Sequence, residues 1–321
     1  MMEFQKKRKI EAVVMEKGDS PVRRWEDLDI NILVTILLSF DLFQLIYAIP
    51  QVCRAWRLAC CDPLLWKTLD LSVLQSNFIR LPLKPYVYVD SPSEKKLTGL
   101  LNICLNLSRG NIQTLIFHTN LYVNDNQLTF AAERCPRLKR LVMPSWNKIK
   151  KRTMCRAIHK WKDLESLTMP SINNPARVIE EIGRSCQNFS VLKIMGTYDM
   201  LFASALASFL PNLEVLSVRC TVLSKPALAI ILEELKKLKV LNISHCIITE
   251  DPEDPPLEPM NILTEPDESI LEKASRLDKF LTCISDSCIM CQRALNDQGF
   301  MRWYKYEEDL WKVDEVKSLA V

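Results

Sequence analysis

A trio of apolar residues with the spacing apolar-x-x-apolar-x-apolar recurs six times in the middle of this chain. The trios begin at Ile112, Leu138, Leu164, Phe189, Leu213 and Leu238, so successive starts are separated by 26, 26, 25, 24 and 25 residues. A period this constant restricts the fold strongly, because each unit must place the same apolar positions in the same local structure.

The residues between the trios follow the apolar spacing of a helix. The pattern i, i+3, i+4, i+7 occurs at Leu128–Cys135, Met154–Trp161, Phe202–Phe209 and Leu228–Leu235. A short strand followed by a helix cannot bury both of its faces alone, so such units stack on one another. The sequence therefore predicts an α/β solenoid with a parallel sheet inside and helices outside.

The chain resembles the leucine-rich-repeat family in its cysteine-containing subtype. Asn242-Ile243-Ser244-His245-Cys246 after Leu241 matches the L-x-L-x-x-C ending of that repeat, and Leu210-Pro211-Asn212-Leu213 looks like the turn that enters a strand. A degenerate unit at Trp66 precedes Ile112 by 46 residues, about two periods, and the run at 86–89 is a candidate for the strand between them. The resemblance implies a leucine-rich-repeat horseshoe over residues 70–248.

Alternation along each strand predicts which side chains face the concave surface, because successive residues point to opposite faces. The side chains expected to face a target protein are Ile116, His118, Arg140, Val142, Thr168, Lys193, Met195, Ser217, Arg219 and Asn242. They contain no acid–base pair, no nucleophile with its base and no metal cluster. We therefore expect a protein-binding surface, and no catalytic residues.

The segment of residues 25–69 has a different pattern. Residues 29–40 are apolar nearly all round, Asp41 is placed to cap a second helix, and Pro50 to start a third. About 45 residues in three short helices make a marginal core. Apolar residues on more than one helix face require a second interface.

This segment resembles an F-box. The matching marks are Leu28-x-x-x-Ile32-Leu33-x-x-Ile36-Leu37, Val52-Cys53-Arg54-Ala55-Trp56-Arg57 and Asp62-Pro63-Leu64-Leu65-Trp66, with Asp29 in place of the usual proline. F-boxes bind the Skp-type adaptor of cullin–RING ubiquitin ligases. The resemblance implies that the adaptor-facing and core surface consists of Leu28, Ile32, Leu33, Ile36, Leu37, Leu45, Val52 and Trp56, and the sequence leaves open which residue has which role.

An F-box followed by leucine-rich repeats, here in a form similar to the plant branch, implies a non-catalytic substrate-recognition subunit of an SCF-type ubiquitin ligase. The alternative is a leucine-rich-repeat scaffold that binds a partner without ubiquitin transfer, with the N-terminal helices as a cap on the solenoid. No run reaches 18 apolar residues and no apolar segment follows the basic start, so we expect no membrane partner and a location in the nucleus, the cytoplasm or both.

The two ends differ from the repeats. Residues 1–24 are expected to form a disordered basic tail. Between Glu250 and Glu272 the chain has nine acids, five prolines and no Lys or Arg, which predicts a linker over 249–267. Residues 268–321 combine a helical pattern with several aromatic residues, and we expect a cap on the end of the solenoid.

A basic run extends from Arg134 to Lys162, with 11 Lys or Arg and no acid. A solvated rim is the favoured interpretation. A site for an acidic or phosphorylated partner segment is the alternative, and nucleic-acid binding is the least favoured.

Twelve cysteines without a secretory signal indicate a reducing compartment and free thiols. Cys283-x4-Cys288-x2-Cys291 has one ligand-like spacing but lacks a fourth ligand nearby, and His245 or Cys246 would complete it only if the tail folded back. The sequence therefore favours thiols over zinc at these positions, and no cofactor.

Overall fold

The computed structural model describes residues 25–75, 77, 79–80, 87–144, 146–169, 175–250, 262–263 and 266–296. The chain divides into two compact units, Met1–Ala59 and Cys60–Val321. None of the helices within the described ranges has both the length and the apolar character that a membrane span requires.

The first unit is helical in the part that the structure describes. Its elements are η1 (Trp25–Asp27), α1 (Ile30–Leu37), the π-helical turn η2 (Gln44–Ala48), η3 (Ile49–Gln51) and α2 (Arg54–Ala59). Asp41 caps the second segment as predicted, since its Oδ1 accepts a hydrogen bond of 2.9 Å from the backbone N–H of Gln44. Pro50 lies in the first turn of the short helix η3, and the third helix α2 begins at Arg54 rather than at Pro50.

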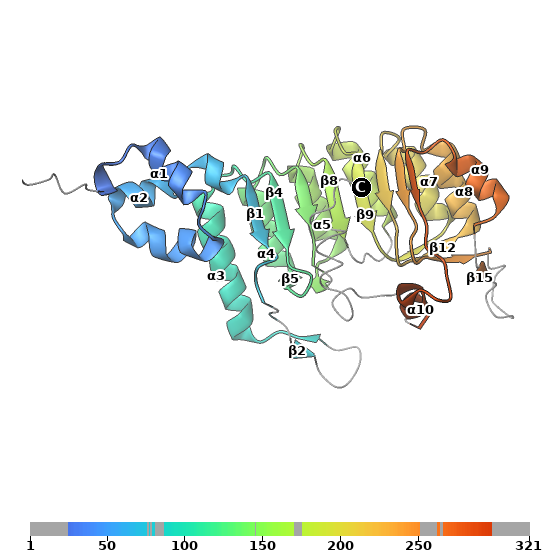
Figure 1. The fold of residues 1–321 in the computed structure, drawn as a ribbon, viewed down its shortest axis with the longest axis horizontal. Helices are drawn as coiled ribbons and strands as arrows, with labels where there is room; N and C mark the ends of the chain where they lie inside the picture. The colour runs from blue at the N-terminus through green and yellow to red at the C-terminus, as the bar shows by residue number, and fades with distance from the viewer. Residues whose placement is uncertain are drawn as a thin grey trace, which may run out of the picture. The chain divides into compact units, whose positions relative to one another are not determined.

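The second unit is built on a parallel sheet of eight strands (Figure 1). In spatial order these are β1 (Thr68–Leu71), β4 (Thr114–Phe117), β6 (Arg140–Val142), β8 (Ser166–Met169), β9 (Val191–Ile194), β11 (Val215–Ser217), β13 (Val240–Asn242) and β16 (Lys279–Leu281). The central leucines of the six trios lie in register, from Leu115 through to Leu241. The predicted α/β solenoid is therefore confirmed.

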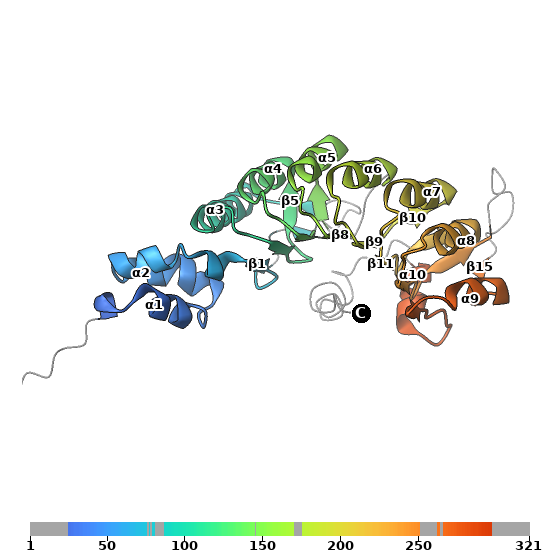
Figure 2. The same ribbon diagram turned by 90° about the horizontal axis from the view of Figure 1, so that it is seen from above.

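The helices of the repeats lie along the outer side of this sheet (Figure 2). They are α3 (Ser91–Leu107), α4 (Asp125–Arg134), α5 (Lys151–Lys160), α6 (Ala176–Ser185), α7 (Met200–Phe209) and α8 (Lys225–Glu234). Consecutive helices pack side by side. Their apolar stripes face the sheet, as Ile158, Leu206 and Ile231 illustrate by being fully buried.

The first repeat differs from the prediction of two units between Trp66 and Ile112. β1 pairs directly with β4, Leu69 opposite Leu115, so no further strand separates them in the sheet. β3 (Val87–Tyr88), which falls in the run expected to supply that strand, pairs instead with β2 (Ile79–Arg80) in an antiparallel hairpin. The 46-residue interval is therefore one enlarged repeat, in which a hairpin and the 17-residue helix α3 replace a second unit.

Small sheets join the loops that lead from the strands to the helices. One contains β10 (Thr197–Tyr198), β12 (Val222–Ser224), β14 (Ile247–Thr249) and β15 (Ile262–Leu263), and another pairs β5 (Tyr122–Asn124) with β7 (Trp146–Lys148). β15 pairs antiparallel with β14. Two parts of the predicted linker, Thr249 and Ile262–Leu263, therefore belong to strands.

The chain after the linker continues the solenoid. α9 (Glu268–Ala274) packs on α8, and β16 extends the sheet with Phe280 opposite Leu241. The Arg276 guanidinium donates hydrogen bonds to the carbonyl groups of Leu232, Leu235 and Leu238 at the end of α8. α10 (Ile289–Asn296) follows, and the predicted cap residues beyond 296 lie outside the described part of the chain.

Candidate partner-binding surfaces and the cysteine cluster

The structure shows which residues of the N-terminal helices form the core and which lie on the surface. The sequence left this assignment open. Leu33, Leu37 and Leu45 are buried, with exposed fractions of 1%, 0% and 8%. Ile32 and Val52 are exposed, at 51% and 56%. The eight residues of the predicted surface therefore include at least three that hold the helices together and two that face solvent.

The remaining three residues of that set, Leu28, Ile36 and Trp56, are half-buried. Trp56 Nε1 donates a hydrogen bond of 3.2 Å to the carbonyl group of Trp25, which ties α2 to the start of the described chain. Trp56 thus has a positioning role within the unit in addition to its exposed edge.

Further large apolar side chains, outside the predicted set, are exposed around the same helices. They are Trp25, Ile30, Leu38, Phe43, Tyr47 and Leu58. So many large apolar side chains exposed on one small unit are unusual and make the unit a candidate contact site for a partner. Their exposure is not predictable from the sequence, because these helices are apolar on every side and have no polar face that marks the side toward solvent.

Asp29, which stands where the F-box pattern usually has proline, is the N-cap of α1. Its Oδ1 accepts a hydrogen bond of 2.8 Å from the backbone N–H of Asn31. An acidic cap satisfies an otherwise unpaired N–H group and interacts favourably with the positive end of the helix dipole. The substitution therefore preserves the start of the helix by a different means.

Seven of the ten residues predicted to face a target lie on the strands, and His118, Met195 and Arg219 lie just after β4, β9 and β11. Most of the ten are buried. The buried ones are Ile116, His118, Val142, Thr168, Lys193, Met195, Ser217 and Arg219. Arg140 and Asn242 remain half-buried. Eight of the ten are therefore buried, and contact of these residues with a target protein stays a prediction.

Two features of the structure account for this burial. Neighbouring strands place Ser217 between Lys193 and Asn242, so the short side chain is shielded by longer ones about 4.8 Å away on each side. In addition, Met290 of α10 belongs to the same buried cluster as Ile116 and Val142. The segment after the last strand thus covers apolar residues that the repeat pattern alone leaves open.

The basic run forms an exposed loop and rim in which several cations have acidic partners. Lys148, Lys151 and Arg152 are exposed, whereas Trp161 is fully buried. Ion pairs join neighbouring repeats, as in Lys139–Glu165 at 2.6 Å and Lys160–Glu133 at 3.2 Å. Such surface pairs contribute little to stability, and they reduce the net positive charge that the local sequence suggests.

Two groups of cysteines differ in their surroundings. Burial raises the pKa of Cys104, Cys135 and Cys186 to about 12, so these are inert core thiols. Cys246 is buried too, and its thiol donates to the carbonyl group of Val218 at 3.0 Å. These positions agree with the expectation of buried free thiols.

The second group, Cys283, Cys288 and Cys291, lies together with His245. The sequence predicts this contact only if the tail folds back. The ligand atoms of His245, Cys283, Cys288 and Cys291 all lie within 4.8 Å of one another. The chain does fold back, because β16 pairs with β13 and carries Cys283 next to His245. This arrangement has the residue types of a metal site, and Cys246 is not part of it.

The repeated strand–helix units and the apolar helical unit before them define a solenoid of the leucine-rich-repeat class with an N-terminal F-box-like segment. The family model described as F-box-like matches residues 30–72. The chain is 54% identical to "F-box/LRR-repeat protein At3g48880" of Arabidopsis thaliana over 299 residues, which cover 93% of this chain and 96% of that protein. The chain therefore belongs to the F-box/leucine-rich-repeat family.

More distant relatives from the same plant support this assignment. "Putative F-box protein At4g11580" is 28% identical over 341 residues, covering 95% of this chain and 98% of that protein. "F-box protein SKIP1" is 25% identical over 245 residues, covering 70% and 79% respectively. The similarity thus extends through the repeats as well as the N-terminal helices.

Proposed function

We propose that this protein is the substrate-recognition subunit of an SCF-type cullin–RING ubiquitin ligase. In this role the N-terminal helices bind a Skp-type adaptor, and the repeats bind a target protein. The observation that carries the proposal is the number of large apolar side chains, such as Ile32, Phe43 and Val52, that the small N-terminal unit leaves exposed. An adaptor that covers these side chains removes apolar surface from water, which favours association.

The chain needs no catalytic group for this function. A target held near an activated ubiquitin reacts faster because its effective concentration is raised. Arg140 and Asn242 are the first candidates for target contact, since they are the two residues of the predicted set that the structure leaves partly exposed. Proximity labelling of the wild type and of Arg140→Ala/Asn242→Ala, with and without proteasome inhibition, tests this part.

Adaptor binding is tested by co-purification with a Skp-type adaptor. The variant Ile32→Glu/Val52→Glu places two charges on the exposed surface without entering the core, so the helices should fold and binding should fall by at least about tenfold. Leu201→Glu is the matched control, because Leu201 is an equally apolar residue that is 75% exposed on α7 of the repeats.

Unchanged adaptor binding by the double variant contradicts the proposal. If neither the wild type nor any variant binds the adaptor, while the repeats still capture a target, the scaffold alternative is supported. Charged substitutions at Leu33 and Leu37 are unsuitable for this test, because both side chains are buried and their replacement would unfold the unit.

A further inference from the structure

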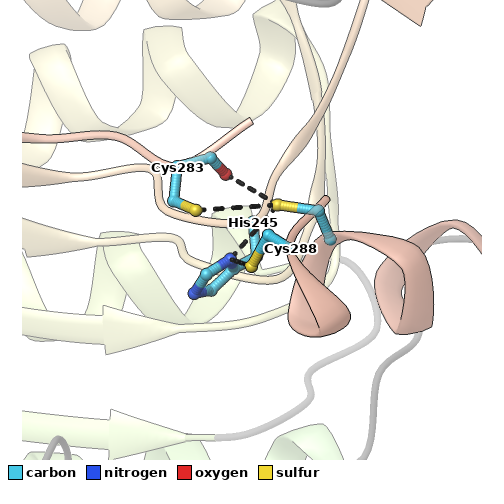
Figure 3. Close-up of side chains that lie close together, drawn as sticks. His245, Cys283 and Cys288 are labelled. Atoms are coloured by element: carbon cyan, nitrogen blue, oxygen red, sulfur yellow. Dashed lines mark hydrogen bonds between the residues drawn. The ribbon is translucent and has the colours of Figure 1, made fainter. Parts of the chain in front are cut away.

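Four potential metal ligands converge from separate segments at the C-terminal end of the solenoid. His245 follows β13, Cys283 follows β16, Cys288 precedes α10, and Cys291 lies in the first turn of α10. Their side chains point toward one another, as Figure 3 shows for His245, Cys283 and Cys288. A backbone hydrogen bond of 2.7 Å from His245 N–H to the Cys283 carbonyl group holds the two loops together.

Three of the six ligand–ligand distances in this cluster match those of a tetrahedral zinc site, and all six lie within 4.8 Å. With Zn–S bonds of about 2.3 Å and Zn–N bonds of about 2.05 Å, tetrahedral angles place two sulfurs about 3.8 Å apart and a sulfur and a nitrogen about 3.6 Å apart. The Sγ atoms of Cys283 and Cys291 are 3.8 Å apart. The His245 Nδ1 atom lies 3.6 Å from Cys288 Sγ and 3.3 Å from Cys291 Sγ.

The chemistry of the cluster distinguishes it from the other thiols of the chain. Cys104, Cys135 and Cys186 are fixed by packing in the core of separate repeats. Here three thiols and an imidazole meet, although thiols are weak hydrogen-bond partners for one another and gain little by such contact. Three thiolates and one neutral histidine form one of the standard ligand sets of structural zinc sites.

The backbone and the surroundings also suit a closed metal site. His245 has a φ of 61°, a left-handed conformation that is uncommon for a residue other than glycine and that often occurs where a side chain has a functional position. Cys291 is buried and the other three ligands are half-buried, which limits access of water.

We propose that His245, Cys283, Cys288 and Cys291 bind one zinc ion in a four-coordinate structural site. The ion joins the loops after β13 and β16 to the start of α10. Because Met290 lies between two of the ligands in sequence and belongs to a buried cluster that includes Met195 and Cys220 of the repeats, the same ion fixes the start of α10 against the repeats. The proposal concerns the repeats alone and does not depend on adaptor binding.

The first test measures the metal content of the full-length protein, purified under reducing conditions without added metal and then dialysed against a zinc buffer. Elemental analysis should find about one zinc per chain. Titration of the metal-free protein with Co²⁺ should give the visible absorption of tetrahedral thiolate coordination. Less than about 0.1 zinc per chain, or a Cys283–Cys291 disulfide in protein that holds no metal, would overturn the proposal.

The second test uses substitutions at one ligand. Cys288→Ser should lower zinc affinity by at least about tenfold, whereas Cys288→His should retain zinc, because imidazole is also a ligand and position 288 is only half-buried. Cys155→Ser is the control, a half-buried cysteine on α5 outside the cluster. Equal zinc content in wild type and in a folded Cys288→Ser/Cys291→Ser variant would also overturn the proposal.

A third measurement uses the wild type alone, so it does not depend on the folding of variants. In the wild type, zinc should shield Cys283, Cys288 and Cys291 from alkylation, and a chelator should make these three thiols reactive while the core cysteines remain protected. Hydrogen exchange in α10 should increase at the same time. If chelation changes neither the alkylation nor the exchange, zinc does not bind there.

Discussion

Gly183 of α6 lies directly against the main chain of Phe209 at the end of α7. A Cβ atom at position 183 would overlap the carbonyl oxygen of Phe209, and would also lie 3.0 Å from its carbonyl carbon. The obstacle is backbone rather than a flexible side chain, so neighbouring repeats must move apart to accept any larger residue. The spacing between α6 and α7 therefore depends on the absence of a side chain at this position.

Gly183→Ala should destabilise the solenoid by about 1–3 kcal/mol, as expected of a substitution that overfills a packed contact. Gly99→Ala is the control, because Gly99 lies within α3 and no heavy atom outside its own helix would lie within 4 Å of the new Cβ. Alanine there should stabilise the protein by about 0.5–1 kcal/mol through its helix propensity. Denaturant unfolding measures both, and equal effects would refute the close approach.

Leu37→Ala should cost the N-terminal unit about 2–5 kcal/mol, because it removes buried atoms and leaves a cavity in a small core. Ile32→Ala, on the same helix but about half exposed, should change stability by less than about 0.5 kcal/mol. Hydrogen exchange of the α1 amides distinguishes the two. Similar losses of protection in both variants would contradict the division into core and surface.

Asp267 begins α9 and also pairs with Lys225 of α8. Its carboxylate accepts a hydrogen bond from Ile270 N–H at 2.9 Å and lies 2.6 Å from Lys225 Nζ. The hydrogen bond from Lys225, followed by that from Ile270, lowers the pKa of Asp267. A lowered pKa in the folded state means that this carboxylate stabilises the protein above the unfolded pKa, and that its contribution is lost as the pH falls through the folded pKa.

We therefore expect Asp267→Ala to loosen α9 at neutral pH more than Asp267→Asn, since asparagine keeps the cap and loses only the charge. The difference between wild type and Asp267→Asn should disappear at a pH low enough to protonate the wild-type carboxylate. Exchange rates of α9 amides, corrected for the intrinsic pH dependence, measure both effects. A pH-independent difference would show that the charge has no role.

Alkylation at pH 8 should distinguish the core cysteines from the half-buried ones outside the core. A pKa of about 12 at Cys104, Cys135 and Cys186 makes the thiolate fraction at pH 8 on the order of a thousandfold smaller than that of an ordinary thiol. Because burial raises the pKa, their reactivity should increase only as the pH approaches that value. Pulsed labelling with mass spectrometry should show modification of half-buried Cys53 first, and denaturation should abolish the difference.

The repeats could be predicted well from the sequence because their information is local and periodic. The register from Leu115 to Leu241 follows from the spacing of the trios alone. The next strand was missed because Phe280 follows Leu241 by 39 residues, and an acidic, proline-rich segment interrupts the period. The prediction of two units before Ile112 was wrong for a different reason: the 46 residues between Trp66 and Ile112 equal about two periods.

The candidate sites depended on contacts that no local pattern contains. The concave residues could be placed on their strands, but not their burial, which involves Met290 far along the chain. Likewise His245 and Cys283 are 38 residues apart and become neighbours only when β16 joins the sheet. When a strand joins the sheet after a linker, the local sequence pattern therefore does not predict which ligands it brings together.

The strand β16 also affects whether copies of this protein can associate through the edges of their sheets. It is the last strand of the sheet in the described chain, it has only three residues, and it begins with the exposed Lys279. Stacked repeats leave an open edge on which another molecule could add its own strand and so start a filament. Such addition at β16 would bury an ammonium group, so the molecule ends its own sheet in a way that opposes head-to-tail polymerisation.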